Sequence, residues 1–491
     1  MDVINSYLEE LATTVNCNLE QVVLIFCIFV SFPIGLINYF IPFPFIRMVF
    51  GLSTGLFLQY FMYQGDMFHC IGASVFTFLY IKLVSRTKFS SPTFLLFLLM
   101  AHLTYLHFKQ MLWTPGGWTL KDITLIHMVL VCKLTSVVFC YEDGMIPDDK
   151  FRNDYQKEKK IVNSPSLLEF FSYSFYVSTA IVGPYTEYAD FRKFIYQEKE
   201  YSNIPMFKAI YCSLWELAYG GICMFMFLSY KDTYNPSFVA TEEFGQFGFF
   251  YKLFYLNMAM NINQCKYYVA WKFITSVNIF NGLAYEPVEK TSIDGEQEIE
   301  HNFTRIQASV VSAAFFNPDI KEKISGWNHQ IHLWLKYNVM LRFINNPWKV
   351  IRDNRVMLTY FVSAAWHGWY PAYYWVFFDF FIIDRICEVL KKDKFFERLE
   401  HSSYILQLIG MIVSLHACNY LGITFALLTI DKVLMYYKNM YFIPNIAMYL
   451  TYIYVVFLKG EYKSSARLEP GKKLDMTKII SHSVDEVKKT K

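Results

Sequence analysis

Apolar segments close to the length needed to cross a lipid bilayer recur along most of this chain. In the first third of the sequence they occupy residues 22–41, 48–63, 68–83, 92–108 and 123–141. A helix needs about 20 apolar residues to cross the hydrocarbon core, where backbone polar groups must be satisfied within the protein. The whole chain agrees with this, since 54% of its 491 residues are hydrophobic and only 18% are charged. The sequence therefore predicts an all-α polytopic membrane protein.

The remaining two thirds continue the pattern with segments of less regular length. Roughly ten to twelve membrane segments are expected in all. The polar residues 261–266, Asn-Ile-Asn-Gln-Cys-Lys, interrupt the pattern and suggest a re-entrant or cavity-lining piece buried in protein. Residues 284–304 are acidic and polar, so we expect a loop there. The later apolar segments lie at residues 165–185, 204–230, 247–260, 267–283, 356–383, 405–430 and 441–458.

The charge distribution predicts an orientation and three regions. The leader, residues 1–20, contains acidic residues and no Lys or Arg, whereas residues 150–160 after the fifth segment contain four Lys and one Arg. By the positive-inside rule the leader is lumenal and the basic loop is cytosolic. The chain ends in Lys488-Lys489-Thr490-Lys491, which resembles a dilysine retrieval signal for the endoplasmic reticulum. We therefore expect a lumenal leader (1–20), a membrane domain (21–458) and a cytosolic tail (459–491).

One titratable imidazole, His367, lies inside the apolar run at residues 356–383. It is flanked by aromatic residues in Trp366-His367-Gly368-Trp369-Tyr370, and the run carries no charge before Asp379. An ionisable group at membrane depth is costly, so it points to a functional site. A neutral histidine hydrogen-bonded within the bundle is the equally common alternative. A second polar cluster upstream favours the functional interpretation.

That second cluster, residues 327–336, places amide and imidazole groups between tryptophans. Asn328 and His332 are four residues apart, which on a helix puts them on one face, and Trp327 and Trp334 would share a face nearby. A carboxamide can orient a substrate or hold a developing oxyanion without ionising, and an imidazole can take a proton from an alcohol. No serine or cysteine is placed as an obvious nucleophile. The pair of Asn328 and His367 therefore suits direct transfer of an acyl group to a hydroxyl.

These motifs resemble the membrane-bound O-acyltransferase family. Its paired residues are an asparagine in a Trp-Asn context and a later histidine in an apolar helix, and they map onto Asn328 and His367. Further elements, spread from Lys133 to Pro371, are similar to the lysophospholipid acyltransferase branch. They are Lys133-Leu134-Thr135-Ser136, Tyr141-Glu142-Asp143-Gly144, Ser164-Pro165-Ser166-Leu167-Leu168-Glu169, Val182-Gly183-Pro184, Trp334-Leu335-Lys336 and Trp366-His367-Gly368-Trp369-Tyr370-Pro371.

The resemblance implies a helical bundle that encloses a reaction tunnel and transfers an acyl group from acyl-CoA to the sn-2 hydroxyl of a lysophospholipid. Lysophosphatidylcholine is the first choice of acceptor, with the ethanolamine and serine lysolipids also in view. His367 would be the general base and Asn328 its assistant. No metal is implied, and no cofactor besides the co-substrate acyl-CoA. Arg342 is a further candidate for contacting CoA, and the candidate substrate contacts are His332, Trp334, Lys336 and Tyr370.

Two other functions are compatible with the sequence. The same fold carries protein O-acylation in the secretory pathway, where a lumenal peptide accepts the acyl group. A polytopic chain with polar groups at midplane could instead be a transporter, although no clear internal repeat is present. The expected surroundings are the lipid bilayer of the endoplasmic reticulum. We expect no nucleic-acid partner, and a homodimer is compatible with the resemblance.

Overall fold

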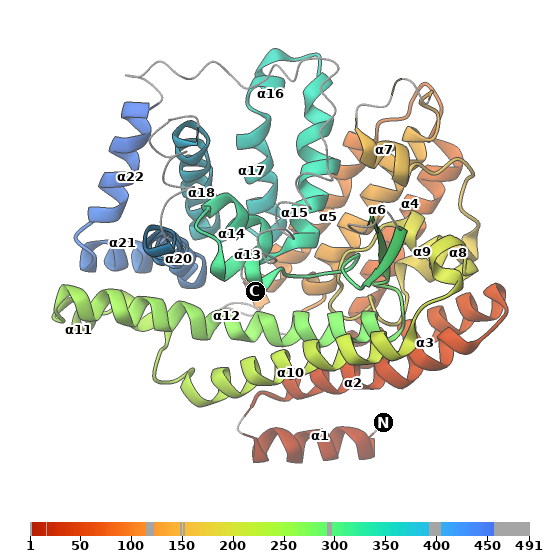
Figure 1. The fold of residues 1–491 in the computed structure, drawn as a ribbon, viewed down its shortest axis with the longest axis horizontal. Helices are drawn as coiled ribbons and strands as arrows, with labels where there is room; N and C mark the ends of the chain where they lie inside the picture. The colour runs from red at the N-terminus through yellow and green to blue at the C-terminus, as the bar shows by residue number, and fades with distance from the viewer. Residues whose placement is uncertain are drawn as a thin grey trace.

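The computed structural model describes residues 2–15, 17–113, 122–147, 150, 153–291, 297–391 and 404–455. Helices make up most of this part of the chain, as the sequence predicts (Figure 1). The predicted cytosolic tail, residues 459–491 with its dilysine motif, lies outside the described residues. The predicted lumenal leader contains a helix, α1 (Asp2–Thr14).

The first five predicted membrane segments are all present as helices. Residues 41–43, Ile-Pro-Phe, separate the first two, and Pro44 then begins the second, because proline cannot continue a helix but suits its first turn. The last of the five, α6, is buried along nearly its whole length and forms the centre of the core. The helices are α2 (Leu19–Phe40), α3 (Pro44–Tyr63), α4 (Met67–Leu83, after a 3₁₀ turn at Gln64–Asp66), α5 (Pro92–Trp113) and α6 (Thr124–Asp143).

Six helical segments of the described chain are long and apolar enough to cross a membrane. They span Leu19–Phe40, Pro44–Leu83, Pro92–Leu112, Thr124–Asp143, Met206–Tyr230 and Tyr404–Leu427. Helix α10 (Met206–Tyr230) exposes many large apolar side chains, including Phe207, Trp215 and Phe225, as a surface in contact with lipid does. The polytopic membrane class is therefore confirmed, while the number of ten to twelve segments stays a prediction.

Residues 165–185 form no long helix, although they are apolar. Only α8 (Leu167–Ser174) forms there, and it starts with a capping box in which Ser166 and Glu169 exchange hydrogen bonds with each other's backbone. Turns that run through the protein interior follow it. The neighbouring short elements are α7 (Asp154–Lys159), α9 (Tyr188–Tyr196), a 3₁₀ turn at Lys199–Ser202, another at Pro236–Ala240, and α11 (Glu242–Gly245).

The two segments predicted at residues 247–260 and 267–283 are one helix, α12 (Phe249–Phe280), which runs beside α10 in Figure 1. The prediction of a re-entrant break at residues 261–266 is wrong, because the helix contains no Gly or Pro and its polar side chains find partners across the bundle. Asn419 donates to Asn261 Oδ1 at 3.0 Å and accepts from Gln264 Nε2 at 3.2 Å. The cavity-lining part of the prediction is confirmed, since Gln264 and Lys266 line the cavity described below.

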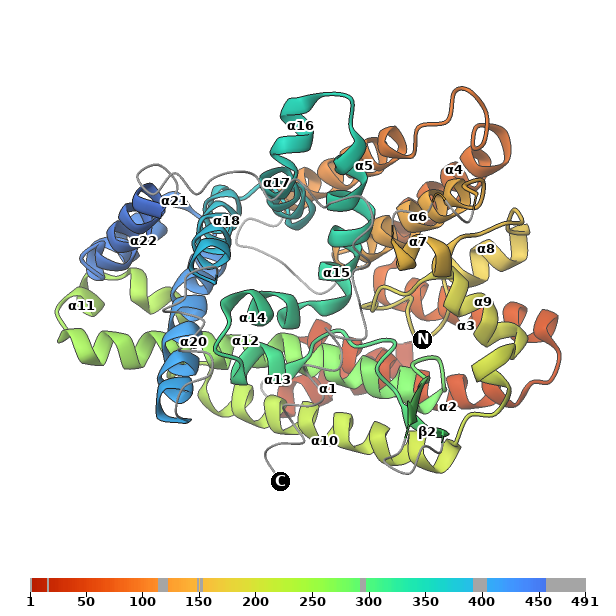
Figure 2. The ribbon, with the colours of Figure 1, turned by 45° about the horizontal axis from the view of Figure 1, so that its top comes forward.

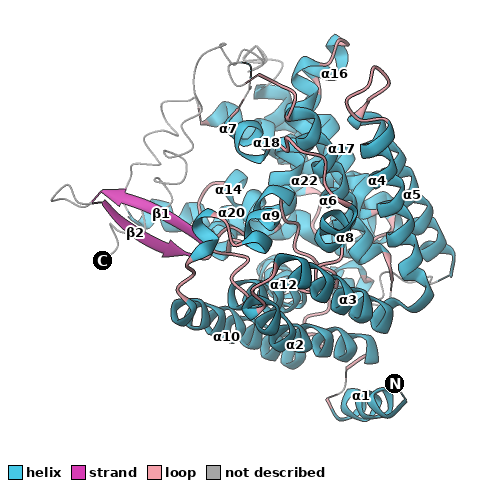
Figure 3. Ribbon diagram, turned by 90° about the vertical axis from the view of Figure 1, so that its right-hand side faces the viewer, coloured by secondary structure: helices cyan, strands magenta, loops and turns pink. Residues whose placement is uncertain are grey.

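Residues 284–304 were expected to be a loop, and this expectation is wrong. They contain an antiparallel hairpin of β1 (Glu286–Thr291) and β2 (Gln297–Asn302), in register from Glu286 opposite Asn302 to Thr291 opposite Gln297. A cross-strand ion pair of Lys290 with Glu300 joins the two strands, and this pairing of opposite charges is not apparent from the acidic composition. Figure 3 shows the hairpin projecting from the helical body.

The C-terminal half of the chain builds the region above α12 in Figure 1. Figure 2 shows α14 and α15 lying between α12 on one side and α17 and α18 on the other. The elements are α13 (Val311–Phe316), α14 (Ile320–Trp327), α15 (His329–Trp334), a π-helical turn (Leu335–Met340), a 3₁₀ turn (Leu341–Asn345), α16 (Lys349–Asp353), α17 (Arg355–His367), α18 (Pro371–Leu390), α20 (Tyr404–Leu427), α21 (Ile430–Asn439) and α22 (Ile443–Ile453).

Candidate active site

A cavity of about 1,460 Å³ extends through the bundle, and both Asn328 and His367 line it. Its walls come from helices that are far apart in the sequence, among them α2, α6, α10, α12, α14, α17, α18 and α20. Pockets that hold small molecules usually measure about 300–1,000 Å³, so this one is large enough for a long ligand. The two predicted catalytic residues therefore face one shared space.

Asn328 does not lie within a helix, although the sequence suggested one. It is the junction between α14 and α15, with φ −124° and ψ 73°. Two backbone hydrogen bonds to the segment before α13 hold this junction, from Val310 N to Gly326 O at 2.8 Å and from His329 N to Ala308 O at 2.9 Å. A Cβ on Gly326 would come within 2.8 Å of Ala313 Cβ, so glycine permits this close packing. The backbone around Asn328 is thereby fixed.

His367 also occupies a helix end. The predicted continuous run 356–383 is broken after His367, because Gly368 adopts φ +131°, a conformation that favours glycine, and Pro371 then starts α18. His367 is therefore the last residue of α17. The break also means that His367 and Asp379 belong to different helices.

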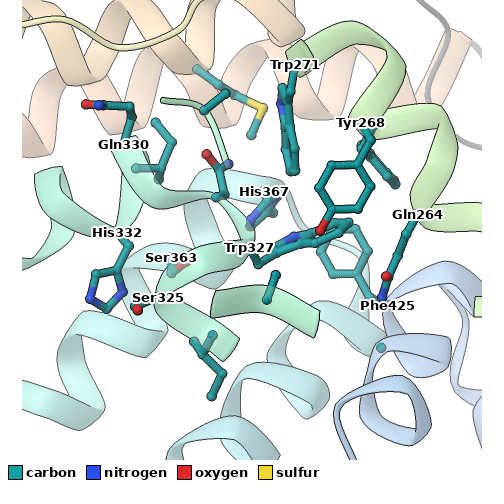
Figure 4. Close-up of a pocket in the computed structure, with 18 of the residues that line it drawn as sticks. Gln264, Tyr268, Trp271, Ser325, Trp327, Gln330, His332, Ser363, His367 and Phe425 are labelled. Atoms are coloured by element: carbon teal, nitrogen blue, oxygen red, sulfur yellow. The ribbon is translucent and has the colours of Figure 1, made fainter. Parts of the chain in front are cut away.

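Aromatic side chains surround the His367 imidazole. Its ring stacks on Phe377 with centroids 5.3 Å apart and meets Phe425 edge-on at 5.0 Å and Trp366 at 4.8 Å. Figure 4 shows His367 in the same pocket as Trp327, Tyr268 and Trp271, whose rings form a further aromatic wall. These walls limit water around the imidazole, which strengthens any polar interaction that a bound substrate makes with it.

The polar side-chain atoms of both site residues are unpaired within the described part of the chain. The His367 imidazole and the Asn328 carboxamide make no side-chain hydrogen bond to any described residue, whereas most buried polar groups are paired. Their donors and acceptors are therefore available to a ligand in the cavity. Within the described ranges, no group of three or more His, Cys, Asp or Glu side chains is placed to bind a metal ion.

The cavity has an apolar region and a charged region. The apolar lining comes from α1, α2 and α10, with residues such as Leu8, Phe29 and Phe227, on the lower side of Figure 1. The charged lining comes from α12, from α14, from the π-helical turn, from residues 353–355 and from α18. It consists of Lys266, Lys321, Glu322, Lys323, Lys336, Asp353, Arg355, Asp384, Arg385 and Glu388. One amphipathic ligand could satisfy both regions.

Most cations of the charged region already have protein partners. Lys321 pairs with Asp384 at 3.0 Å, Arg385 pairs with Asp384 and Glu388, and Lys323 donates to Phe315 O. Lys336 and Lys266 make no ion pair with a residue of the described chain, and their ammonium groups lie over the rings of Tyr337 at 5.2 Å and Tyr267 at 5.0 Å. Both lysines are thus open to an anionic ligand, and Lys336 is the one that follows the Asn328 junction in the chain.

The structure brings some of the other predicted site residues to the cavity and leaves others outside it. His332 and Lys336 line it, and His332 follows Asn328 by one helical turn. Tyr370 is at the start of α18, with its ring against Tyr373, and does not line the cavity. Arg342 is likewise outside, because both of its terminal nitrogens donate to Asp143, at 2.7 and 2.6 Å.

Trp334 is also outside the cavity. It is completely buried, and its indole Nε1 donates to Thr135 Oγ1 on α6 at 3.1 Å. The expectation that Trp327 and Trp334 share one helix face is wrong, because the Asn328 junction lies between them. The structure assigns Trp334 to packing between α15 and α6.

We expect Trp334→Phe to lower stability while leaving substrate affinity unchanged. The substitution removes a buried hydrogen bond and part of a large packed side chain, a loss of about 1–3 kcal/mol. The check is the melting temperature of the purified protein in detergent, set beside KM for each substrate. A raised KM with an unchanged melting temperature would contradict this assignment.

Sequence reasoning missed several lining residues. Ser363 lies one turn before His367 on α17 and faces the same pocket, and the four-residue spacing would have identified it (Figure 4). Gln330 lines the pocket next to the Asn328 junction, and its Nε2 donates to Arg305 O at 3.0 Å. Tyr268, Trp271 and Phe425 come from α12 and α20, and no local signal distinguishes them from other aromatic residues of these helices.

The sequence of this chain matches a known protein family. The family model described as MBOAT, membrane-bound O-acyltransferase family, matches residues 111–430, about two thirds of the chain. This match includes both Asn328 and His367.

Curated relatives cover most of the chain at low identity. A Schizosaccharomyces pombe protein named Lysophospholipid acyltransferase is 24% identical over 450 residues, which are 87% of this chain and 84% of that protein. A Saccharomyces cerevisiae protein of the same name is 27% identical over 417 residues, 79% of this chain and 65% of its own length. Lysophospholipid acyltransferase 2 of Arabidopsis thaliana is 24% identical over 459 residues, 89% of this chain and 94% of that protein.

Proposed function

The chain belongs to the membrane-bound O-acyltransferase family and is an acyltransferase, and on this premise we propose that it transfers the acyl group of acyl-CoA to the sn-2 hydroxyl of a lysophospholipid. The observation that carries the proposal is one large cavity in which Asn328 and His367 both present unpartnered polar groups. The names of the relatives support a lysophospholipid as the acceptor. Lysophosphatidylcholine is the proposed acceptor, with lysophosphatidylethanolamine and lysophosphatidylserine as the nearest alternatives.

The division of the cavity into two regions supports a defined pose for the donor. The acyl chain would occupy the apolar region beside α2 and α10, and the anionic CoA moiety would lie toward the charged region that includes Lys336. The thioester would then sit between them, at Asn328 and His367. Acyl-CoA is consumed as a co-substrate in this scheme.

The proposed chemistry is direct transfer. The His367 imidazole takes the proton of the sn-2 hydroxyl as its oxygen attacks the thioester carbonyl carbon. The Asn328 carboxamide orients that hydroxyl or donates a hydrogen bond to the carbonyl oxygen, on which negative charge develops. The carbon–sulfur bond then breaks, and the proton passes from the imidazole to the CoA thiolate. The ester and free CoA are the products, and the imidazole returns to its starting state.

The test is acyl transfer by membranes that contain the protein, given an unsaturated acyl-CoA and a panel of lysophospholipids with choline, ethanolamine or serine headgroups. Mass spectrometry of the lipids identifies the product. A diacyl product that depends on one headgroup supports the proposal and names the acceptor. Absence of any product with well-expressed protein would contradict it and move the assignment to peptide acceptors, which the same membranes can be offered.

We expect Lys336→Ala to raise KM for acyl-CoA by roughly 3- to 10-fold, since a lost exposed ion pair costs about 1 kcal/mol. The value of kcat should not change, because the phosphates of CoA stay far from the bond that breaks. Added salt should reduce the difference between variant and wild type, since screening weakens the same interaction.

The matched control for Lys336 is Lys349→Ala. Lys349 starts α16, is exposed and does not line the cavity, so its loss changes net charge equally without touching the donor. Equal KM changes in both variants would show that Lys336 acts only through general charge.

The charge distribution also supports a proposed location in the cell. The acidic leader and the basic loops fit a multi-pass protein of the endoplasmic reticulum membrane whose C-terminus is cytosolic. The charged region of the cavity would then open to the cytosol, where acyl-CoA is available. A homodimer remains compatible with this arrangement.

A further inference from the structure

We propose that His107 of α5, aided by Thr104, is a positioning residue that sets the orientation of the His367 imidazole from outside the cavity. The inference rests on the proposed function, because it assigns a role relative to His367 as the base. Neither α5 residue lines the cavity, so neither can touch the substrate.

His107 contacts the chain on both sides of His367. Its Nε2 donates to the carbonyl oxygen of Trp366 at 3.0 Å. On the other side, its ring packs against Gly368, where a Cβ would lie 3.4 Å from His107 Nδ1. The His107 side chain is 1% exposed, so water does not compete for the hydrogen bond.

The Trp366 carbonyl belongs to the peptide unit that joins Trp366 to His367. A hydrogen bond to this oxygen therefore fixes the peptide plane that precedes the histidine Cα, and with it the direction in which the imidazole leaves the backbone. The carbonyl is also one of the last four of α17, which lack helical partners. Because a carbonyl only accepts, the bond also requires that Nε2 of His107 carries the hydrogen.

Two indole hydrogen bonds complete the attachment of this turn. Trp369 Nε1 donates to Thr104 Oγ1 at 3.1 Å, and Thr104 lies one turn before His107 on the same face of α5. Trp366 Nε1 donates to Met128 O on α6 at 2.8 Å. The turn is thus held at the residue before His367 and at the residue two positions after it, while the imidazole itself is left free for the substrate.

A role in capping α17 alone would make His107 important for folding but not for the reaction itself. The two roles separate in kinetics, since a misplaced base lowers kcat without changing substrate binding. A misplacement of about 1 Å at a reacting group can cost on the order of 10²-fold in rate.

In His107→Phe, which keeps a ring against Gly368 but has no donor, we expect kcat to fall roughly 10- to 100-fold with both KM values unchanged. His107→Gln, whose amide Nε2 can donate to the Trp366 carbonyl, should keep kcat within a few-fold of wild type. Thr104→Val is a milder, nearly isosteric change that releases the Trp369 indole, and a several-fold loss in kcat is expected. It provides a second measurement if His107→Phe accumulates poorly in membranes.

The matched control is His102→Phe. His102 is also a histidine of α5, but its contacts are His69 and His127, and it does not touch the His367 turn. Its kcat should equal that of wild type. Wild-type kcat in both His107→Phe and Thr104→Val would overturn the proposal, as would equal losses in His107→Phe and His107→Gln.

A chemical readout separates this inference from the proposed function. Diethyl pyrocarbonate labels accessible imidazoles, and mass spectrometry of the peptide that contains residue 367 gives the rate. We expect faster labelling of His367 in His107→Phe than in wild type or His102→Phe, because the freed turn exposes more of the ring. An unchanged rate would refute positioning by His107, whereas transfer retained in His367→Ala would refute only the assignment of the base.

Discussion

Membranes that contain His367→Ala protein are expected to show acyl transfer reduced on the order of 10²–10⁴-fold, because a general base contributes about that much to the rate. The loss should appear in kcat. The imidazole makes no hydrogen bond to other described residues, so its removal breaks no polar interaction within that part of the fold. The measurement is product formation by mass spectrometry, normalised to the amount of protein in the membrane.

The control for His367→Ala is His416→Ala, which removes an imidazole from α20 that is bonded to Asn257 at 2.7 Å and does not line the cavity. This variant tests whether losing any intramembrane histidine disturbs the bundle enough to abolish transfer. Transfer retained by a well-expressed His367→Ala protein would refute the base. If both variants were inactive and both melted early, the effect would belong to folding.

Asn328→Ala should also lose transfer, by on the order of 10²-fold or more if its amide holds the oxyanion. Asn328→Asp adds a sharper test, since it keeps the shape of the side chain but replaces the NH₂ donor by a carboxylate that repels developing negative charge. Both variants should therefore be inactive. Two backbone hydrogen bonds hold the α14–α15 junction independently of the Asn328 side chain, so the comparison isolates the amide.

The kinetic pattern of Asn328→Ala distinguishes its two proposed roles. A fall in kcat with unchanged KM indicates an interaction made only in the transition state, whereas a change confined to KM indicates a binding residue. Asn235→Ala is the control, because that exposed carboxamide caps a surface turn by accepting from Ser237 N at 2.9 Å. Full activity in Asn328→Ala would remove Asn328 from the mechanism.

Some features of the protein could be predicted because their causes are local. The first five membrane segments agree with α2 to α6 to within a few residues, since length and apolarity alone decide whether a helix can cross a bilayer. His367 and Asn328 could be selected because a titratable or amide group in an apolar segment is costly to bury and therefore indicates a functional site. The helix ends at which they lie could not be predicted, since a glycine in the sequence does not reveal the close packing found at Gly326 or the positive φ found at Gly368.

What only the tertiary structure decided is which side chains face the cavity, and the reason is that the partners come from distant parts of the chain. Thr135 holds the indole of Trp334, and Asp143 holds both terminal nitrogens of Arg342, each from 199 residues away. Both residues are thereby kept out of the site that their positions in the sequence suggested. The sequence by itself determined the membrane-protein class and the two polar groups of the site. The packing of distant helices decided how those groups meet and what surrounds them, because hydrogen bonds between segments far apart leave no trace in local composition or spacing.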